Sequence, residues 1–207
     1  SRLEDDAGDE DALKALERLY ERTSRWRELV EVLKAREQSS TDPTERKRTM
    51  VRAAETLADK LSDVSEAIDA WRAVQDDFGA DPVTLSALET LYEKAERWAD
   101  LADSLEQHLT IADEVGTRVD LFARLGDVRR LKGDIDLTGA LDAYRQALLL
   151  DPSNERCRAA LEALLDNADA RREAAEVLRP LYEADGDSER LLRVLEDLTE
   201  QGEAVVV

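Results

Sequence analysis

The chain has 207 residues, of which 49 are acidic and 29 basic, so its formal net charge is -20 at pH 7. A nucleic-acid-binding surface needs concentrated Lys and Arg to displace the counterions of phosphate, so this charge argues against nucleic acid as a partner. Aromatic residues make up only 4% of the chain, which leaves Leu and Ala to supply most of the core. Leu, Ala, Glu and Arg favour helix, and only eight Gly and four Pro interrupt them. The composition predicts an all-α protein.

Cys157 is the single cysteine, which excludes an intramolecular disulfide and a cysteine-based metal cluster. A reducing compartment fits this cysteine usage, and we expect a cytoplasmic location. No apolar run approaches the roughly 20 residues that span a bilayer, so no membrane insertion is expected. The chain begins with Ser1 rather than Met, and we expect it to be a piece of a longer protein.

The first elements follow from apolar spacing and from helix-start signals. The acidic run at the beginning predicts a solvated N-terminal linker over residues 1–10. Leu13, Leu16 and Leu19 have helical spacing and predict a helix over 9–22. After a polar break, a second stripe of apolar residues predicts a helix over 25–38.

Asp42 and Pro43 form a helix start, with Asp42 as N-cap, and the pair Asp-Pro returns at 81–82 and 151–152. Gly79, Gly133 and Gly186 stand where helices should end. Pro180 predicts a kink or a division of the tenth helix. The nine helices predicted after the first two cover 43–61, 64–78, 82–95, 97–112, 116–132, 137–150, 154–166, 169–185 and 187–202.

The sequence repeats itself. Residues 16–33 return as 88–105, and residues 67–72 return as 140–145. Each large period therefore holds two related units of about 36 residues, each with two helices. The residues that recur after 72 positions are Leu16, Glu17, Leu19, Tyr20, Glu21, Arg25, Trp26, Leu29 and Leu33.

The pattern resembles the tetratricopeptide repeat family, and residues 119–152 carry the resemblance best. Leu125-Gly126 stands for the family's Leu-Gly pair, and Ala140, Tyr144 and Ala147 for its small–aromatic–small series. Residues 48–82 fit more loosely. The resemblance implies an all-α fold, a right-handed α-α superhelix (a tetratricopeptide-like solenoid) of about five helix pairs plus a terminal helix.

The predicted domain organisation follows from the repeat. A helical-repeat domain is expected over 11–202, followed by a truncated C-terminal end at 203–207. The predicted units cover 11–42, 43–80, 82–114, 116–152 and 154–185, with the terminal helix at 187–202.

The resemblance also implies where a ligand would lie. In the family, the first helix of each pair lines a concave groove that binds peptides. The recurring Lys and Arg residues among these positions suggest a groove for an acidic peptide or a C-terminal carboxylate. The alternative is a solvated helix face with ordinary ion pairs. The implied positions are Lys14, Arg18, Arg22, Arg52, Thr56, Lys60, Ser86, Thr90, Lys94, Ala123, Asp127 and Arg130.

The large aromatic residues are predicted to fill the gaps between units rather than to stack on a ligand. They occupy equivalent places in successive repeats, which is typical of core positions. The residues concerned are Trp26, Trp71, Trp98 and Tyr144.

Candidate chemical sites are weak. His108 is the sole histidine and is expected at the surface or at an interface. Residues 134–139 imitate the opening of a calcium loop, but Arg145 stands where a bidentate Glu is needed. Cys157 lies between two arginines without a nearby catalytic partner and is expected to be passive. We therefore predict no catalytic residue, no metal and no cofactor.

The predicted function is a protein–protein interaction or scaffolding module, without enzymatic activity, whose concave helical surface binds a protein or peptide partner. The alternative is a structural spacer or a self-associating repeat unit. Self-association through the C-terminal end is suggested by the apolar residues 204–207, because solenoids normally finish with a polar capping helix.

Overall fold

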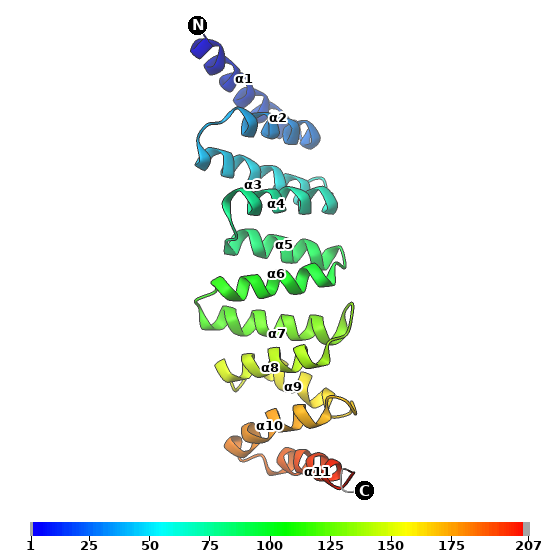
Figure 1. Ribbon diagram of the computed structural model, residues 1–207. Coiled ribbons are helices and arrows are strands. Elements are labelled where there is room, and N and C mark those ends of the chain that lie inside the picture. Colours follow the sequence, from blue (N-terminus) through cyan, green and yellow to red (C-terminus); the bar gives the residue numbers. More distant parts are fainter. Residues whose placement is uncertain (1, 205–207) are drawn as a thin grey trace. The chain divides into compact units, whose positions relative to one another are not determined.

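The computed structural model describes residues 2–204, and that part of the chain is helical without strands (Figure 1). It divides into two compact units, unit 1 (Ser1–Arg97) and unit 2 (Trp98–Val207). The helices of unit 1 are α1 (Arg2–Arg22), α2 (Trp26–Ser39), α3 (Pro43–Asp59), α4 (Val64–Phe78) and α5 (Pro82–Lys94). Those of unit 2 are α6 (Trp98–Ile111), α7 (Val115–Leu131), α8 (Leu137–Leu150), α9 (Glu155–Leu164), α10 (Arg171–Asp185) and α11 (Ser188–Ala204).

The helix prediction is confirmed over the described residues, with α4 and α8 matching at both ends. The capping signals explain this agreement. The Asp42 carboxylate accepts a hydrogen bond from the backbone N–H of Thr44 at 3.0 Å, and Asp81 accepts from those of Val83 and Thr84 at 2.9 Å. These bonds satisfy backbone donors that a helix start leaves without an intrahelical partner.

Two local predictions are wrong. The expected linker over residues 1–10 is helical from Arg2 onward. Residue 1 and residues 205–207 of the expected C-terminal end lie outside the described part. In addition, the predicted division of the helix at Pro180 is wrong, because α10 runs through the proline with the buried side chains of Leu178 and Tyr182 on either side of it; the alternative, a kink, stays a prediction.

In unit 1, each helix packs against the next one in the sequence. A core cluster of Leu29, Leu33 and Ala53 joins α2 to α3, and the rings of Tyr20 and Trp26 pack against it. The connection from α4 to α5 turns at Gly79, whose φ of +81° is a conformation that side-chain-bearing residues rarely adopt.

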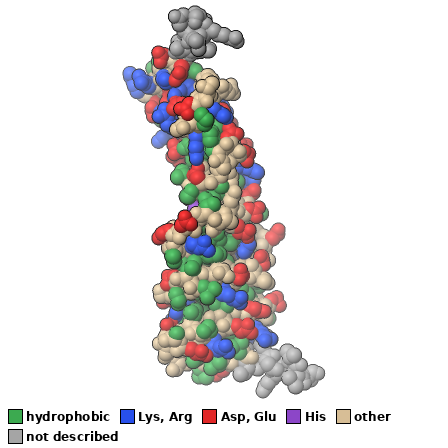
Figure 2. All heavy atoms as spheres, turned by 60° about the vertical axis from the view of Figure 1, so that its left-hand side comes forward, with side chains coloured by type: hydrophobic (Ala, Val, Ile, Leu, Met, Phe, Trp, Pro, Cys, Tyr) green, Lys and Arg blue, Asp and Glu red, His purple; other side chains and the backbone are tan. Residues whose placement is uncertain are grey.

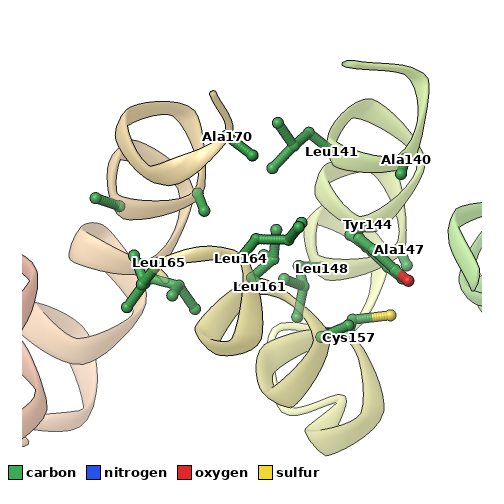
Figure 3. Packing of buried hydrophobic residues seen from close by; sticks show 14 of the residues in the cluster. Ala140, Leu141, Tyr144, Ala147, Leu148, Cys157, Leu161, Leu164, Leu165 and Ala170 are labelled. Atoms are coloured by element: carbon green, nitrogen blue, oxygen red, sulfur yellow. The ribbon is translucent and has the colours of Figure 1, made fainter. Parts of the chain in front are cut away.

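In unit 2, successive helices also pack in sequence order, and the largest cluster of buried apolar residues extends from α7 to α11. Figure 3 shows its centre, where Leu148 of α8 lies beside Leu161 and Leu164 of α9, and Leu141 of α8 lies near Ala170. The predicted small–aromatic–small series is buried, because small side chains let the helices approach closely.

The aromatic prediction is confirmed for Trp71 and Tyr144, which are buried. It is only partly right for Trp26 and Trp98, whose side chains are partly exposed at the first residues of α2 and α6. There the ammonium group of a lysine covers each ring: Lys60 lies 5.7 Å from the ring centre of Trp26, and Lys132 lies 5.0 Å from that of Trp98. A cation over the ring face partly replaces the missing apolar neighbours.

Over the described residues, no helix combines the length and the apolar character that crossing a membrane requires.

Candidate partner-binding surface

A surface groove of about 680 Å³ lies over α3 in unit 1 and is here called the α3 groove. Its lining combines apolar side chains with more basic than acidic ones. The lining residues are Pro43, Thr44, Lys47, Arg48, Val51, Arg52, Glu55 and Phe78.

The sequence of α3 places these side chains together. From Thr44 to Glu55, each lining position has another lining position three or four residues away, so these side chains share one face of the helix. Phe78, the last residue of α4, closes one side of the groove. The Asp42 cap and Pro43 fix the start of α3 and therefore the register of this face.

The basic groups of the groove have acidic neighbours. Lys47 pairs with Asp81 at 2.7 Å, and Arg48 pairs with Glu45 at 2.7 Å. Burial acts to raise the pKa of Asp81, but its hydrogen bonds with Lys47 and the Thr84 backbone outweigh burial, so the pKa lies below its usual range. These pairs are partly exposed, and exposed ion pairs contribute little stability, so an incoming carboxylate can replace the internal one at low cost.

Of the predicted groove residues, Arg52 is the one that lines the α3 groove. Its side chain pairs with two carboxylates of another helix. Its guanidinium contacts Glu17 of α1 and lies 2.9 Å from Glu21. Glu17 is buried and also bonds Arg36 of α2, whose other partner is Glu45. Arg52 therefore joins α1 to α3, and removing it would leave the buried Glu17 carboxylate with one fewer partner.

The other predicted positions of unit 1 are dispersed. Thr56 is buried, with its hydroxyl donating to the Arg52 carbonyl oxygen at 2.7 Å, and Lys60 covers Trp26. Lys14 pairs with Glu10 at 2.6 Å on α1. The remaining predicted positions of unit 1 are exposed on α1 and α5; these are Arg18, Arg22, Ser86, Thr90 and Lys94.

Three predicted positions lie in unit 2, on α7. Ala123 is buried in the core cluster and offers no surface to a ligand, which corrects its expected place in the groove. Asp127 accepts hydrogen bonds from the Tyr144 hydroxyl at 2.6 Å and from Arg156 at 2.7 Å. Arg130 donates to the Tyr144 oxygen at 3.1 Å. Burial and, to a smaller extent, the bond to Asp127 hold the pKa of Tyr144 above its usual value.

The same arrangement recurs one repeat further along unit 2. The Tyr182 hydroxyl of α10 donates to Glu162 of α9, and Arg190 of α11 lies 3.6 Å from the same carboxylate. Each set contains an acid on a first helix, a tyrosine on its second helix and an arginine on the next first helix. Asp127 therefore joins neighbouring repeats through Arg156, whereas Arg130 bonds Tyr144 within its own repeat.

The sequence analysis missed Lys47, Arg48, Val51 and Phe78. The family pattern pointed to every fourth residue of α3, and each such step turns about 40° around an α-helix, from the groove toward the core at Thr56. The consecutive basic residues 46–48, just after a capped helix start and one turn before Arg52, were a signal that could have identified the groove.

The residues that the sequence analysis weighed as possible catalytic or metal-binding groups are His108, Cys157 and the stretch 134–139. His108 is buried on α6, so of its two expected places, surface or interface, the surface is excluded. Burial raises the pKa of the Cys157 thiol to about 11, despite the neighbouring Arg156. Asp136, part of the calcium-like stretch, caps α8 by accepting from the Gly139 backbone N–H at 2.9 Å.

The sequence profile of the tetratricopeptide repeat matches residues 12–47 and 84–119. These two stretches contain the segments that recur after 72 positions, α1–α2 and α5–α6. No curated protein sequence matches the chain.

Solved helical-repeat structures share the fold. MamA 41-end from Desulfovibrio magneticus RS-1 is 16% identical with a TM-score of 0.51, and the match covers 87% of this chain and 97% of that one. A tetratricopeptide repeat protein from Parabacteroides merdae ATCC 43184 is 12% identical with a TM-score of 0.53, covering 92% of this chain and 79% of that one. The chain therefore has a helical-repeat fold, within which residues 12–47 and 84–119 match the tetratricopeptide repeat.

Proposed function

We propose that this chain is a protein-interaction module, without catalysis of its own, and that its α3 groove binds an acidic segment of the partner. The observation that carries the proposal is the lining of this groove. The lining contains three basic side chains, Lys47, Arg48 and Arg52, but only one acidic side chain, Glu55. It also contains the apolar side chains of Val51 and Phe78. A partner segment with carboxylates and an apolar side chain matches both features.

The charge of the surroundings makes this groove distinct. The chain as a whole carries a net charge of -20, and Figure 2 shows acidic and basic side chains interspersed over the face in view. Three of the lining residues are basic and one is acidic, and a partner carboxylate that replaces their internal acidic partners favours binding at this place. The prefolded helices also lose little entropy when the segment docks.

Arg48 provides the sharpest test, because its side chain is 74% exposed and its ion pair is with Glu45 rather than with the buried Glu17. We expect Arg48→Glu to weaken binding of a fluorescein-labelled peptide of Glu and Leu about ten-fold, or about 1.4 kcal/mol, because attraction becomes repulsion. Fluorescence anisotropy at low and high salt measures the affinity. High salt should reduce the difference between the two proteins.

Arg72→Glu is the matched control, since Arg72 is an exposed arginine of α4 outside the groove. It should leave the affinity within about two-fold of the parent. If both substitutions weakened binding equally, the binding would depend on overall charge and not on the α3 groove. If the parent protein bound a peptide of Lys and Leu as tightly as the peptide of Glu and Leu, an acidic partner would be rejected.

The alternative function, self-association through the C-terminal end, is favoured by α11. Leu192 and Leu195 are exposed on this helix, while Val194 faces the core. If copies associate here, we expect Leu192→Glu to weaken the association about ten-fold, because a carboxylate would have to be buried. Sedimentation equilibrium over a range of concentrations measures this. Leu149→Glu, at an exposed leucine of α8, is the control, and a parent chain that stays monomeric rejects the alternative.

A further inference from the structure

A surface groove of about 340 Å³ lies in unit 2 between α8 and α10, the second helices of two successive repeats. It is here called the α8–α10 groove, and it shares no residue with the α3 groove. The helices α7, α9 and α11 pack against α8 and α10, so the groove does not arise from a missing neighbour at an end of the chain. Its lining residues are Arg145, Leu148, Leu149, Glu176, Val177, Pro180 and Leu181.

The last turn of α8 is apolar where that of the related helix α4 is polar. Positions 67–72 and 140–145 are 73 apart, so 75–77 of α4 correspond to 148–150 of α8. The sequence there is Gln-Asp-Asp in α4 but Leu-Leu-Leu in α8. The middle leucine, Leu149, is 69% exposed. Because α4 has an acid at this repeat position, helix packing does not require the leucine, and an exposed apolar patch beside a groove marks an interaction site.

Arg145 lines this groove and has no partner within the chain. In the part of unit 2 that the structure describes, it is the one basic residue without an ion pair, a hydrogen bond or a ring contact. Glu176 lines the same groove, but its carboxylate pairs with Arg172 of its own helix at 3.1 Å. A carboxylate from outside the chain would give Arg145 a charge-assisted hydrogen bond.

Pro180 adds a hydrogen-bond acceptor to the wall of the groove. In an α-helix, the backbone N–H of residue 180 would donate to the carbonyl oxygen of residue 176. Proline has no N–H, although α10 continues through it, so the Glu176 carbonyl lacks its usual intrahelical donor. Both residues line the groove, so a donor from a bound segment can reach this oxygen.

We propose that the α8–α10 groove binds a segment of another protein that carries a tryptophan close to a carboxylate. The indole ring covers Leu149 and Val177, its N–H donates to the Glu176 carbonyl oxygen, and the carboxylate pairs with Arg145. An indole combines a large apolar body with one donor and no acceptor, so its burial leaves no polar atom without a partner. The groove also has room for the ring, since a cavity of roughly 150 Å³ holds benzene.

A second copy of this chain does not offer such a ring. Trp71 is buried in unit 1. Trp26 and Trp98 are partly buried, and a lysine ammonium group lies over the ring of each. The tryptophan therefore comes from a different protein.

The test is a double-mutant cycle between Pro180 and the tryptophan of a peptide. Two fluorescein-labelled peptides of Ser and Ala each carry two Glu and one aromatic residue, which is Trp in one peptide and Phe in the other. Fluorescence anisotropy measures their affinities for the full parent chain and for Pro180→Ala. Alanine restores the N–H that occupies the Glu176 carbonyl, and it suits a helix interior better than proline, so this variant stays folded.

We expect Pro180→Ala to weaken binding of the Trp peptide about five-fold and that of the Phe peptide less than about two-fold, because Phe has no donor to lose. Arg145→Glu should weaken binding of the Trp peptide about ten-fold, since attraction becomes repulsion. Arg193→Glu is its control, at an exposed arginine of α11 outside the groove, and should change the affinity less than about two-fold.

Equal effects of Pro180→Ala on the two peptides would overturn the proposal, as would a parent chain that does not bind the Trp peptide. Equal weakening by Arg145→Glu and Arg193→Glu would also overturn it, because binding would then follow overall charge. Arg48→Glu should leave the affinity for the Trp peptide within about two-fold. A larger loss would assign this peptide to the α3 groove, so failure of either groove is measured separately.

Discussion

Gly126→Ala is expected to destabilise unit 2 by about 2–3 kcal/mol. A Cβ atom at position 126 would lie 2.5 Å from Cε1 of Tyr144, far inside van der Waals contact. The ring cannot move aside easily, because it is fully buried and its hydroxyl is held by Asp127. This clash exceeds the roughly 0.5–1 kcal/mol that Ala normally gains over Gly inside a helix. Urea unfolding followed by circular dichroism measures the loss.

Gly116→Ala, in the same helix, is the matched control. Its Cβ would meet the end of the flexible Glu114 side chain, at 2.9 Å from Oε1, and that side chain can shift. We expect this variant to unfold within about 1 kcal/mol of the parent. If Gly126→Ala proved as stable as Gly116→Ala, the close approach of α8 to α7 at the Tyr144 ring would be wrong.

Trp71→Ala is expected to destabilise unit 1 by about 3–5 kcal/mol. The indole is 3% exposed and lies on the face of α4 that joins the repeats, so its removal leaves a cavity as well as losing apolar burial. Urea unfolding followed by circular dichroism at 222 nm measures the change, because this helix signal does not depend on the tryptophan that is removed. A substantial loss is predicted even though Trp71 is not among the residues that line the α3 groove.

Trp26→Ala is the comparison within the same unit. This ring is partly exposed and keeps the Lys60 ammonium group 5.7 Å from its centre, so less apolar surface is lost and water can fill the space. We expect less than about half the effect of Trp71→Ala. Similar losses for both variants would contradict the different burial of the two rings.

The secondary structure was predictable because its signals are local. Asp42-Pro43 and Asp81-Pro82 specify helix starts through bonds that reach only two or three residues. The 72-residue recurrence and the series Ala140, Tyr144 and Ala147 indicated paired helices without reference to any distant contact. The acidic beginning misled us because its composition is typical of a solvated linker, although the same carboxylates also suit a helix N-terminus.

The candidate site was less predictable, because exposure depends on neighbours. Leu16 and Leu88 are the same residue at the same repeat position, yet one is exposed and the other buried. Arg52 was identified as a groove residue, but its anchoring to Glu17 across two helices leaves no trace in the local sequence. The family register likewise could not show that Ala123 and Thr56 face the core.

The sequence alone determined the helical class, the pairing of helices into repeats and most helix boundaries, because periodic apolar residues and caps act over a few residues. The tertiary structure decided which charged side chains are bound internally and where a hollow remains. Those outcomes depend on side chains from separate helices meeting in space, as Lys47 meets Asp81 and Tyr144 meets Asp127.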